Sequence, residues 1–262
     1  MEFFETKQGK VFNADCLDPY FDKVIPDASI DMILCDLPYG TTACAWDEII
    51  PFIPLWSFYN RIIKPKGAIV LTASQPFTTK LIASNLPMFK YELIWVKNNG
   101  TGFIHAKNMP LKKHENICIF SKGVVLHENQ TDQRMDYFPQ GLIPIAAKKI
   151  CFEKTRRIDT HLVPRGAGFS VKEFSNYPTS VLFFDIEIGL HPTQKPVPLF
   201  QNLITTFTLE GATVLDNCAG SGTTGIACIN SNRNFLLIEK DADYYSGILK
   251  RIQTHKVEGS LF

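Results

Sequence analysis

Two short apolar segments, each with the composition of a β-strand, run directly into loops of unusual composition. The first loop is Asp36-Leu37-Pro38-Tyr39-Gly40, which follows the apolar run Ser29–Cys35. The second is Asp216-Asn217-Cys218-Ala219-Gly220-Ser221-Gly222-Thr223-Thr224, which follows Ala212–Leu215. Open α/β sheets bind their ligands at the carboxyl ends of their strands. We therefore expect both loops to lie at the ligand-binding edge of such a sheet.

The order of strands and helices supports this fold. Segments with strand composition are Lys10–Ala14, Ser29–Cys35, Ala68–Thr72, Tyr91–Val96, Asn116–Phe120, Thr213–Asp216 and Phe235–Glu239. Helical patterns lie between them, at Pro51–Ile63, Pro76–Asn85, Val197–Phe207, Thr223–Asn230 and Ala242–Gln253. Because strands alternate with helices, we predict an α/β fold with a doubly wound, mostly parallel, seven-stranded sheet.

The segment from about Lys122 to Ile188 breaks this alternation. It is rich in proline, glycine, polar and basic residues and shows no clear period. We interpret it as an inserted recognition segment outside the sheet. The predicted organisation is therefore 1–121, an insertion at 122–188, and 189–262.

Length and cysteine content narrow the class of protein. A chain of 262 residues can bury a sizeable core, and no apolar run approaches the ~18 residues of a membrane span. The seven cysteines are odd in number and form no CxxC pair, which argues against a disulfide framework and a structural zinc site. The N-terminus lacks the pattern of a signal peptide, so we expect a cytoplasmic protein with reduced thiols.

Basic residues are unevenly distributed although the net charge is only +1. They gather in two stretches, the first with Lys107, Lys112 and Lys113, the second with Lys148, Lys149, Lys154, Arg156, Arg157, Arg165 and Lys172. A charge cluster is often no more than a solvated surface. A local basic face on a neutral protein also suits a nucleic-acid partner.

The glycine-rich loop matches a nucleoside-binding pattern. Gly220-x-Gly222-x-x-Gly225 follows a strand and opens a helix, and Glu239 ends the next strand. The same glycines would also serve a plain strand-to-helix turn. No lysine follows them, which excludes a phosphate-binding GxxxxGK loop. Asp216 at the strand tip suits a cationic amine better than a pyrophosphate. S-adenosylmethionine has such an amine, a ribose for Glu239 and no phosphate.

The other loop offers the groups that would activate the exocyclic amine of a nucleic-acid base. That amine is a poor nucleophile because its lone pair is delocalised into the ring. Hydrogen bonds to the Asp36 carboxylate and the Leu37 carbonyl would localise the lone pair for attack on a methyl sulfonium. Pro38 fixes the backbone, and Tyr39 offers a stacking face for an extruded base. An ordinary turn is the alternative, because Asp, Pro and Gly are common turn residues.

These motifs resemble those of the amino-methylating DNA methyltransferases, which have an (Asp/Asn/Ser)-Pro-Pro-Tyr loop and an Asp-x-Phe-x-Gly-x-Gly loop. The catalytic loop comes first here, and His191-Pro192-Thr193-Gln194-Lys195-Pro196 precedes the cofactor loop. This order resembles the circularly permuted β class of bacteria and phages. The resemblance implies a catalytic half at 1–121, target recognition at 122–188 and a cofactor-binding half at 189–262.

Carried over residue by residue, the resemblance assigns roles to both loops. It implies a catalytic loop of Asp36, Leu37, Pro38 and Tyr39. It implies a cofactor site for S-adenosylmethionine formed by Asp15, Asp36, Thr193, Lys195, Asp216, Cys218, Gly220, Ser221, Gly222, Thr223, Thr224 and Glu239. Within this set, Thr193 and Lys195 would bind the methionine carboxylate, and Asp15 the cofactor adenine. Two residues depart from the family pattern: Leu37 replaces a proline and Cys218 replaces a phenylalanine.

The expected function is site-specific methylation of adenine N6 in double-stranded DNA, by base flipping and direct transfer. The expected DNA-facing residues are Tyr39, Lys107, Lys112, Lys113, Lys148, Lys149, Arg156, Arg157 and Arg165. The resemblance is compatible with a homodimer and with a cognate restriction endonuclease. Metals are not implied, since Cys118 interrupts the HExxH pattern that His114-Glu115 would begin. We expect a structural or DNA-facing role for that pair.

Three alternatives remain open at this point. The same acceptors suit N4 of cytosine, although Asp at position 36 favours adenine. A nicotinamide dehydrogenase would account for the glycine turn but not for Asp36–Tyr39 or His191–Pro196. A nucleic-acid-binding module with the same fold and no activity is the third.

Overall fold

The structure is a computed structural model that describes residues 2–41, 47–125, 131–152, 168–187 and 194–255. Only the backbone is described at 131, 147–152 and 168–171. The chain divides into two compact units, Met1–Phe138 with Ser180–Phe262 and, separately, Pro139–Thr179. No helix within the described ranges is long and apolar enough to cross a membrane.

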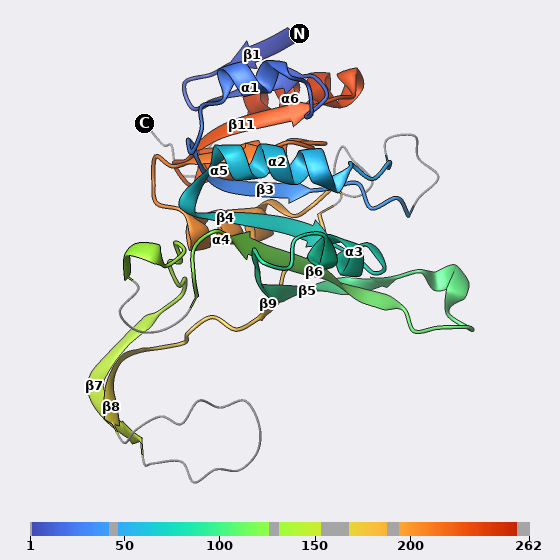
Figure 1. Cartoon of the computed structure of the whole chain (residues 1–262). Helices are drawn as coiled ribbons and strands as arrows, with labels where there is room; N and C mark the ends of the chain where they lie inside the picture. Colours follow the sequence, from blue (N-terminus) through green and yellow to red (C-terminus); the bar gives the residue numbers. More distant parts are fainter. Residues whose placement is uncertain (1, 42–46, 126–130, 153–167, 188–193, 256–262) are drawn as a thin grey trace. The chain divides into compact units, whose positions relative to one another are not determined.

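A nine-stranded sheet forms the centre of the first unit (Figure 1). Its strand order is β1-β2-β11-β10-β3-β4-β6-β5-β9. The strands are β1 (Glu2–Glu5), β2 (Gly9–Asn13), β3 (Ile30–Asp36), β4 (Ile63–Ala73), β5 (Phe89–Thr101), β6 (Lys112–Ser121), β9 (Val181–Phe183), β10 (Thr213–Asp216) and β11 (Asn234–Glu239). From β2 to β4 all neighbours pair in parallel, whereas β1 and β6 pair antiparallel with β2 and β4.

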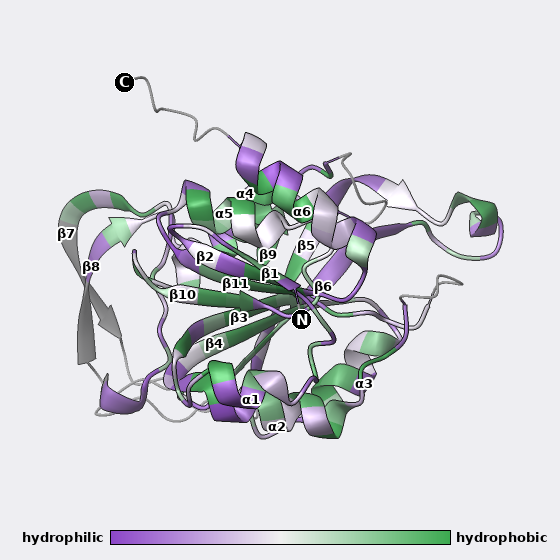
Figure 2. Ribbon diagram, turned by 90° about the horizontal axis from the view of Figure 1, so that it is seen from above, coloured by the Kyte–Doolittle hydropathy of each residue, from purple (hydrophilic) through white to green (hydrophobic). Residues whose placement is uncertain are grey.

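Helices cover both faces of this sheet (Figure 2). One face carries α1 (Tyr20–Val24), α2 (Phe52–Ile62) and α3 (Phe77–Ser84), and the other carries α4 (Val197–Phe207), α5 (Thr223–Asn230) and α6 (Ala242–Thr254). Successive side chains of a strand point to opposite faces. In β4, Ala68 and Val70 therefore pack beneath α4–α6, and Ile69 and Leu71 pack beneath α1–α3.

The two halves of the chain meet where β3 pairs with β10. The register joins Met32 to Val214 and Ile33 to Leu215, and all four side chains are fully buried. Just before these pairs, the Thr213 N–H donates to the Asp31 carboxylate at 2.9 Å. This junction places the ends of β3 and β10, with their two loops, next to each other.

The doubly wound α/β fold is confirmed, and all seven predicted strands and five predicted helices occur. The predicted number of strands is wrong, because β1 and β9 extend the sheet at its two edges. The prediction that 122–188 lies wholly outside the sheet is also wrong. Val181–Phe183 pairs in parallel with β5, and Met135 is buried in the main core. Strand β9 escaped detection because its three residues are too few to show a period.

The second unit, Pro139–Thr179, contains a hairpin of β7 (Ile143–Phe152) and β8 (Gly168–Ser175). The strands are antiparallel, with Lys148 opposite Lys172 and Lys149 opposite Val171. The Asn176 side chain donates to the Gly141 carbonyl at 2.8 Å, which fastens the open end of the hairpin. This unit contains fewer residues than the predicted insertion at 122–188. Its role in target recognition stays a prediction.

Candidate active site

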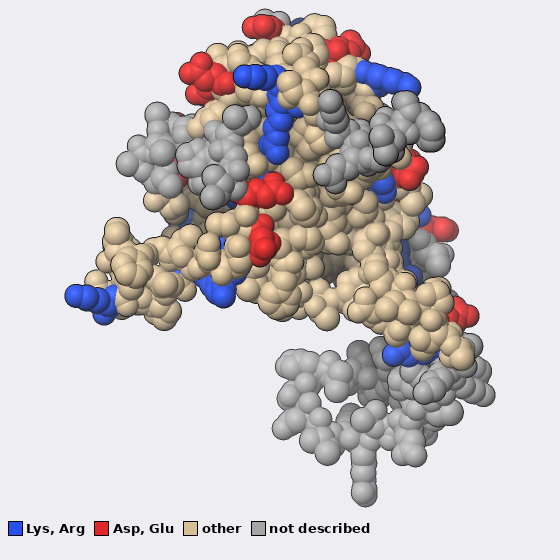
Figure 3. All heavy atoms as spheres, turned by 180° about the vertical axis from the view of Figure 1, so that it is seen from behind, with Lys and Arg blue, Asp and Glu red and all other residues tan. Residues whose placement is uncertain are grey.

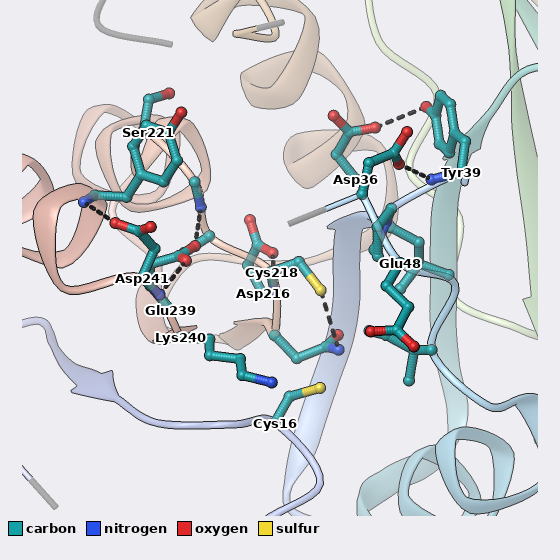
Figure 4. A pocket seen from close by; sticks show the side chains of 18 of the residues that line it. Cys16, Asp36, Tyr39, Glu48, Asp216, Cys218, Ser221, Glu239, Lys240 and Asp241 are labelled. Carbon is teal, nitrogen blue, oxygen red and sulfur yellow. Dashed lines mark hydrogen bonds between the residues drawn. The ribbon is translucent and has the colours of Figure 1, made fainter. Parts of the chain in front are cut away.

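The parallel pairing from β2 to β4 brings the carboxyl ends of five strands to one edge of the sheet. A cavity of about 660 Å³ lies at this edge. Such a volume is within the range of small-molecule sites. Figure 4 shows Glu239 and Asp241 toward one end of the cavity, Asp36 and Tyr39 toward the other, and Asp216 and Cys218 between them. The structure thus brings the two predicted loops into one site.

Asp36, the last residue of β3, is the centre of a polar cluster. Its Oδ1 accepts hydrogen bonds from the Tyr39 hydroxyl at 2.7 Å and from the Thr72 hydroxyl. Its Oδ2 lies 2.6 Å from the Lys195 ammonium. Thr72 faces Asp36 because β4 pairs with β3 in parallel at this position. The carboxylate is thereby held at the cavity wall by three partners.

Buried charges of alternating sign extend from Asp36. Lys195 Nζ lies 3.4 Å from Glu115 Oε2, and Glu115 Oε1 pairs closely with Lys97. Burial alone would lower the pKa of Lys195, but the carboxylates of Asp36 and Glu115 outweigh it and raise that pKa above its ordinary value. Burial would raise the pKa of Glu115, but the two lysines hold it below its usual range. Both groups therefore stay charged at neutral pH.

Asp47 holds the backbone of the loop that follows Asp36. Its Oδ1 accepts from the N–H groups of Tyr39 at 2.7 Å and Gly40 at 2.9 Å. Its Oδ2 accepts from the N–H of Thr41 at 2.8 Å. The Asp47 side chain is only 8% exposed, so these charge-assisted bonds are largely shielded from water. The loop is fixed by a residue that the sequence motif does not contain.

The Tyr39 side chain points toward Asp36. Burial and then the Asp36 charge raise the pKa of its hydroxyl well above the usual value, so that it stays protonated and donates. One face of the ring stacks on Phe77, with centroids 5.2 Å apart and an interplanar angle of 25°. Lys195 Nζ lies 5.8 Å from the ring centroid. Stacking of an extruded base on Tyr39 stays a prediction.

Asp216 ends β10 and is almost completely buried. Its carboxylate accepts from the Cys218 N–H at 3.1 Å and from the Thr224 hydroxyl. Burial raises the pKa of Asp216 to about 7, since these hydrogen bonds compensate only part of the desolvation. A cation bound beside it would restore the charged form.

The turn after Asp216 depends on two of its glycines. Gly220 and Gly222 have backbone φ angles of +51° and +76°, which residues with a side chain rarely adopt. A Cβ at Gly222 would also lie 3.0 Å from Ile248 of α6. The turn therefore approaches α6 more closely than another residue would allow.

The neighbouring strand tips supply two further carboxylates. Glu239 Oε2 accepts from the Gly220 N–H at 2.7 Å, and its Oε1 accepts from the Asp241 N–H at 2.9 Å. Asp15 accepts from the Leu17 N–H at 2.9 Å and pairs with Lys240 at 3.0 Å. Both carboxylates line the cavity, and each oxygen retains a lone pair for a ligand hydroxyl or amine.

Arg251 of α6 forms hydrogen bonds to the glycine-rich turn that follows Asp216. Its guanidinium donates to the Ser221 carbonyl at 2.9 Å and to the hydroxyls of Ser221 and Thr223 at 3.2 Å each. The Thr223 hydroxyl in turn donates to the Lys195 carbonyl at 3.2 Å. Through these bonds the turn and the segment that carries Lys195 are held together.

Cys218, the departure from the family pattern, lies among other thiols. Its Sγ accepts from the Asn217 side chain at 3.7 Å and is within hydrogen-bonding reach of Cys16 and Cys35. Its hydrogen bond to Cys16 lowers the pKa of the Cys16 thiol. Cys16 and Cys218 both line the cavity (Figure 4). Thiols therefore line this part of the cavity.

The structure does not place every predicted residue. Thr193, Arg156, Arg157 and Arg165 lie outside the described residues, and only the backbone of Lys148 and Lys149 is described, in β7. Lys107, Lys112 and Lys113 lie on the β5–β6 hairpin, and the side chain of Lys195 meets Asp36 and Glu115. The roles assigned to all these residues stay predictions. Sequence reasoning gave no role to Thr72, Asp47 or Arg251, and it expected a structural or DNA-facing role for Glu115 without connecting it to Lys97 and Lys195.

Comparisons with known proteins identify the family. The profile of the DNA methylase family, N6/N4 type, matches residues 30–251. The Type II methyltransferase M1.MboII of Moraxella bovis is 26% identical over 248 residues, which cover 90% of this chain and 93% of that protein. The DNA adenine methyltransferase YhdJ of Escherichia coli (strain K12) is 27% identical over 254 residues, covering 88% and 78%.

Two solved structures share the fold. The M1.HpyAVI–SAM complex superposes with a TM-score of 0.59 at 22% identity, covering 93% of this chain and 99% of that one. The PvuII DNA methyltransferase, described as cytosine-N4-specific, superposes with a TM-score of 0.67 at 14% identity, covering 97% and 90%. Because the family profile spans most of the chain, from β3 to α6, this protein belongs to the N6/N4 DNA methylase family.

Proposed function

We propose that this DNA methyltransferase transfers a methyl group from S-adenosylmethionine to N6 of adenine in double-stranded DNA. The observation that carries the proposal is the position of Asp36. Its carboxylate lines the same cavity as Asp216 and Glu239, and it bonds to proton donors that leave it able to accept more. An acceptor next to a nucleoside site suits an amine as the group that reacts.

The residues of the cavity fit this cofactor. Glu239 can accept from ribose hydroxyls, and Asp216 can pair with the ammonium of the methionine part. Gly220 lines the cavity and leaves its backbone open to a close approach, since a Cβ there would lie no nearer than 4.0 Å to another atom. When bound, the cofactor supplies an electrophilic methyl sulfonium. YhdJ, the adenine methyltransferase among the relatives, supports the choice of base, whereas PvuII keeps N4 of cytosine as the alternative.

The chain itself contributes acceptors and charge. Asp36 accepts a hydrogen bond from the amine, and the Leu37 carbonyl accepts the second one, which localises the nitrogen lone pair. The nitrogen forms the new N–C bond while the C–S electron pair remains on sulfur. One amine proton leaves by way of Asp36. The Lys195 ammonium, 2.6 Å from Oδ2, holds the Asp36 carboxylate in position beside the reacting amine.

Base flipping is part of the proposal. Asp36 lies in a cavity at the sheet edge, and its oxygens are only partly accessible, with the side chain 25% exposed. A base that is stacked in a duplex cannot bring its exocyclic amine to such a group, so it must leave the stack. Recognition of the target sequence is assigned to the second unit, and the homodimer and endonuclease partner stay expectations of the family resemblance.

Mass spectrometry of nucleosides from DNA treated with the purified protein tests the proposal. We expect N6-methyladenine, and a loss of at least about 100-fold in methyl transfer for Asp36→Ala, whose missing acceptor acts in the transition state. Asp243→Asn, an exposed change on α6, is the matched control. N4-methylcytosine would select the alternative base, and retained activity in Asp36→Ala would refute the catalytic role. No methylated base, together with cofactor binding by calorimetry, would favour an inactive binding module.

A further inference from the structure

The β5–β6 hairpin extends well beyond the edge of the sheet at which the cavity lies. In register, Asp36 is level with Thr72, and Thr72 is level with Ile117 of β6. The hairpin continues from there to Lys112, which is paired with Thr101. At ~3.4 Å per residue this adds roughly 17 Å before the turn begins. Figure 1 shows the hairpin projecting past the ends of β3 and β4.

The tip of the hairpin is folded but displays apolar side chains to solvent. A 3₁₀ turn at Phe103–His105 is held by local backbone hydrogen bonds. The His105 N–H donates to the Gly102 carbonyl at 2.9 Å, and the Met109 N–H donates to the His105 carbonyl at 3.0 Å. Phe103 is 81% exposed, Ile104 86% and Met109 59%. The backbone bonds hold this tip without any core beneath it, so its large apolar side chains are available to a partner.

The charge around these side chains indicates the partner. Between residues 93 and 114 the chain has four lysines and no acidic residue. In Figure 3 the hairpin is a projecting arm with blue lysine atoms and no red carboxylate atoms on the visible side of its end. A second copy of this chain, meeting the tip in a two-fold contact, would bring like charges together. The phosphates of a nucleic acid would be attracted to Lys107, Lys112 and Lys113, whereas Lys97 is already ion-paired with Glu115.

The base of the hairpin is joined to the active site. Lys97 of β5 and Glu115 of β6 are ion-paired to each other, and Glu115 reaches Lys195 beside Asp36. The arm is therefore positioned relative to the reacting group by buried contacts. The base of the hairpin therefore has a fixed place beside Lys195 and Asp36.

We propose that the hairpin tip is a duplex wedge: Phe103 and Ile104 insert between base pairs beside the target base, while Lys107 and Lys113 bind the flanking phosphates. Apolar side chains that enter a base step unstack it and bend the duplex. Unstacking beside the target lowers the cost of extruding the base into the cavity. This proposal rests on the proposed function, which it extends by assigning the residues that open the duplex.

The test compares the double variant Phe103→Ala/Ile104→Ala with Ile53→Ala, which removes an equally exposed side chain from α2. The substrates are duplexes of the recognised sequence, found by sequencing methylated DNA, with the target either paired or opposite an abasic site. We expect the double variant to lose 10- to 100-fold in kcat/KM on the paired duplex and to come within about threefold of the parent on the abasic duplex. Ile53→Ala should match the parent on both.

Three results would overturn the wedge: full activity of the double variant on the paired duplex, an equal loss on both duplexes, or sedimentation showing that the tip instead joins two copies of the chain. Fluorescence of 2-aminopurine beside the target keeps this test separate from methylation. The parent should raise it on binding and the double variant should not, also when S-adenosylmethionine is left out and no base can be methylated. In Lys107→Ala, the slope of log binding constant against log salt concentration should fall by about one unit. An unchanged slope would contradict a contact between Lys107 and a phosphate.

Discussion

Glu115 lies between two ammonium groups, and its replacement by glutamine should destabilise the protein. The chain of charges Lys97, Glu115, Lys195 and Asp36 is neutral overall, and the exposed fractions of the four side chains are 13%, 11%, 6% and 25%. At the 3.4 Å between Glu115 and Lys195, Coulomb attraction is roughly 5 kcal/mol at an effective dielectric constant of ~20 and roughly 1 kcal/mol in bulk water. Removing one partner of a buried pair costs about 3–5 kcal/mol. We expect Glu115→Gln to lower the free energy of unfolding by about 3 kcal/mol.

Urea unfolding of the cofactor-free protein measures this loss. Glu92→Gln is the control, because Glu92 is an exposed glutamate of the neighbouring strand that accepts from Asn116 at 2.9 Å. Adding Lys97→Met to Glu115→Gln restores neutrality and should recover at least about 1 kcal/mol.

The lysines hold the pKa of Glu115 below its usual range, so its contribution is present above the unfolded pKa. The contribution is lost as pH falls through the folded pKa, and the parent and Glu115→Gln should then converge. A difference below about 0.5 kcal/mol at pH 7, or no recovery in the double variant, would refute the reasoning.

Two further predictions concern the loops. The Asp47 carboxylate accepts hydrogen bonds from three backbone N–H groups, and in Asp47→Asn at least one of these groups would face an amide donor instead. The loop would lose about 1.5–3 kcal/mol of stabilisation, which should slow kcat at least about tenfold. Asp243→Asn should leave kcat unchanged in the same assay. Because the pKa of Asp216 is raised to about 7, the carboxyl is neutral below that pH and must lose a proton to pair with an ammonium. Affinity for S-adenosylmethionine by calorimetry should therefore rise about tenfold from pH 5.5 to 6.5, and Asp216→Asn should abolish that slope. An affinity of the parent that does not change with pH would contradict the pairing of Asp216 with the ammonium of the cofactor.

The fold could largely be predicted because its central strands are apolar, longer than three residues and separated by helices with a clear period. Strand β4 is an example, since Ala68–Thr72 is buried on both faces. The edge strand β1 is exposed over most of its length and has a glutamate at each end, and β9 has only three residues, so neither shows an apolar run. The antiparallel direction of β6 was also not predicted, because the polar run Asn98–Gly102 indicates a loop but not the direction of the strand that follows it.

The two loops could be predicted as parts of one site because each follows a strand and carries its own chemistry. The residues that support them could not. Asp47 binds the catalytic loop through backbone N–H groups, which leave no trace in the sequence pattern. Glu115 and Lys97 acquire their roles only when β5 and β6 bring them to Lys195, which lies 80 residues beyond Glu115 in the chain. Long-range pairs of this kind are set by the topology of the sheet.

The junction of β3 with β10 has a consequence for how the protein is made. Asp36 and Asp216 lie 180 residues apart in the chain, and they become neighbours only when the last strands dock on the first. Closing a loop of that length costs about 5 kcal/mol in chain entropy, which the burial of Met32, Ile33, Val214 and Leu215 must offset. A chain still being synthesised therefore carries the catalytic loop long before it can hold a cofactor. Any activity that needs both loops therefore requires the segment that contains β10.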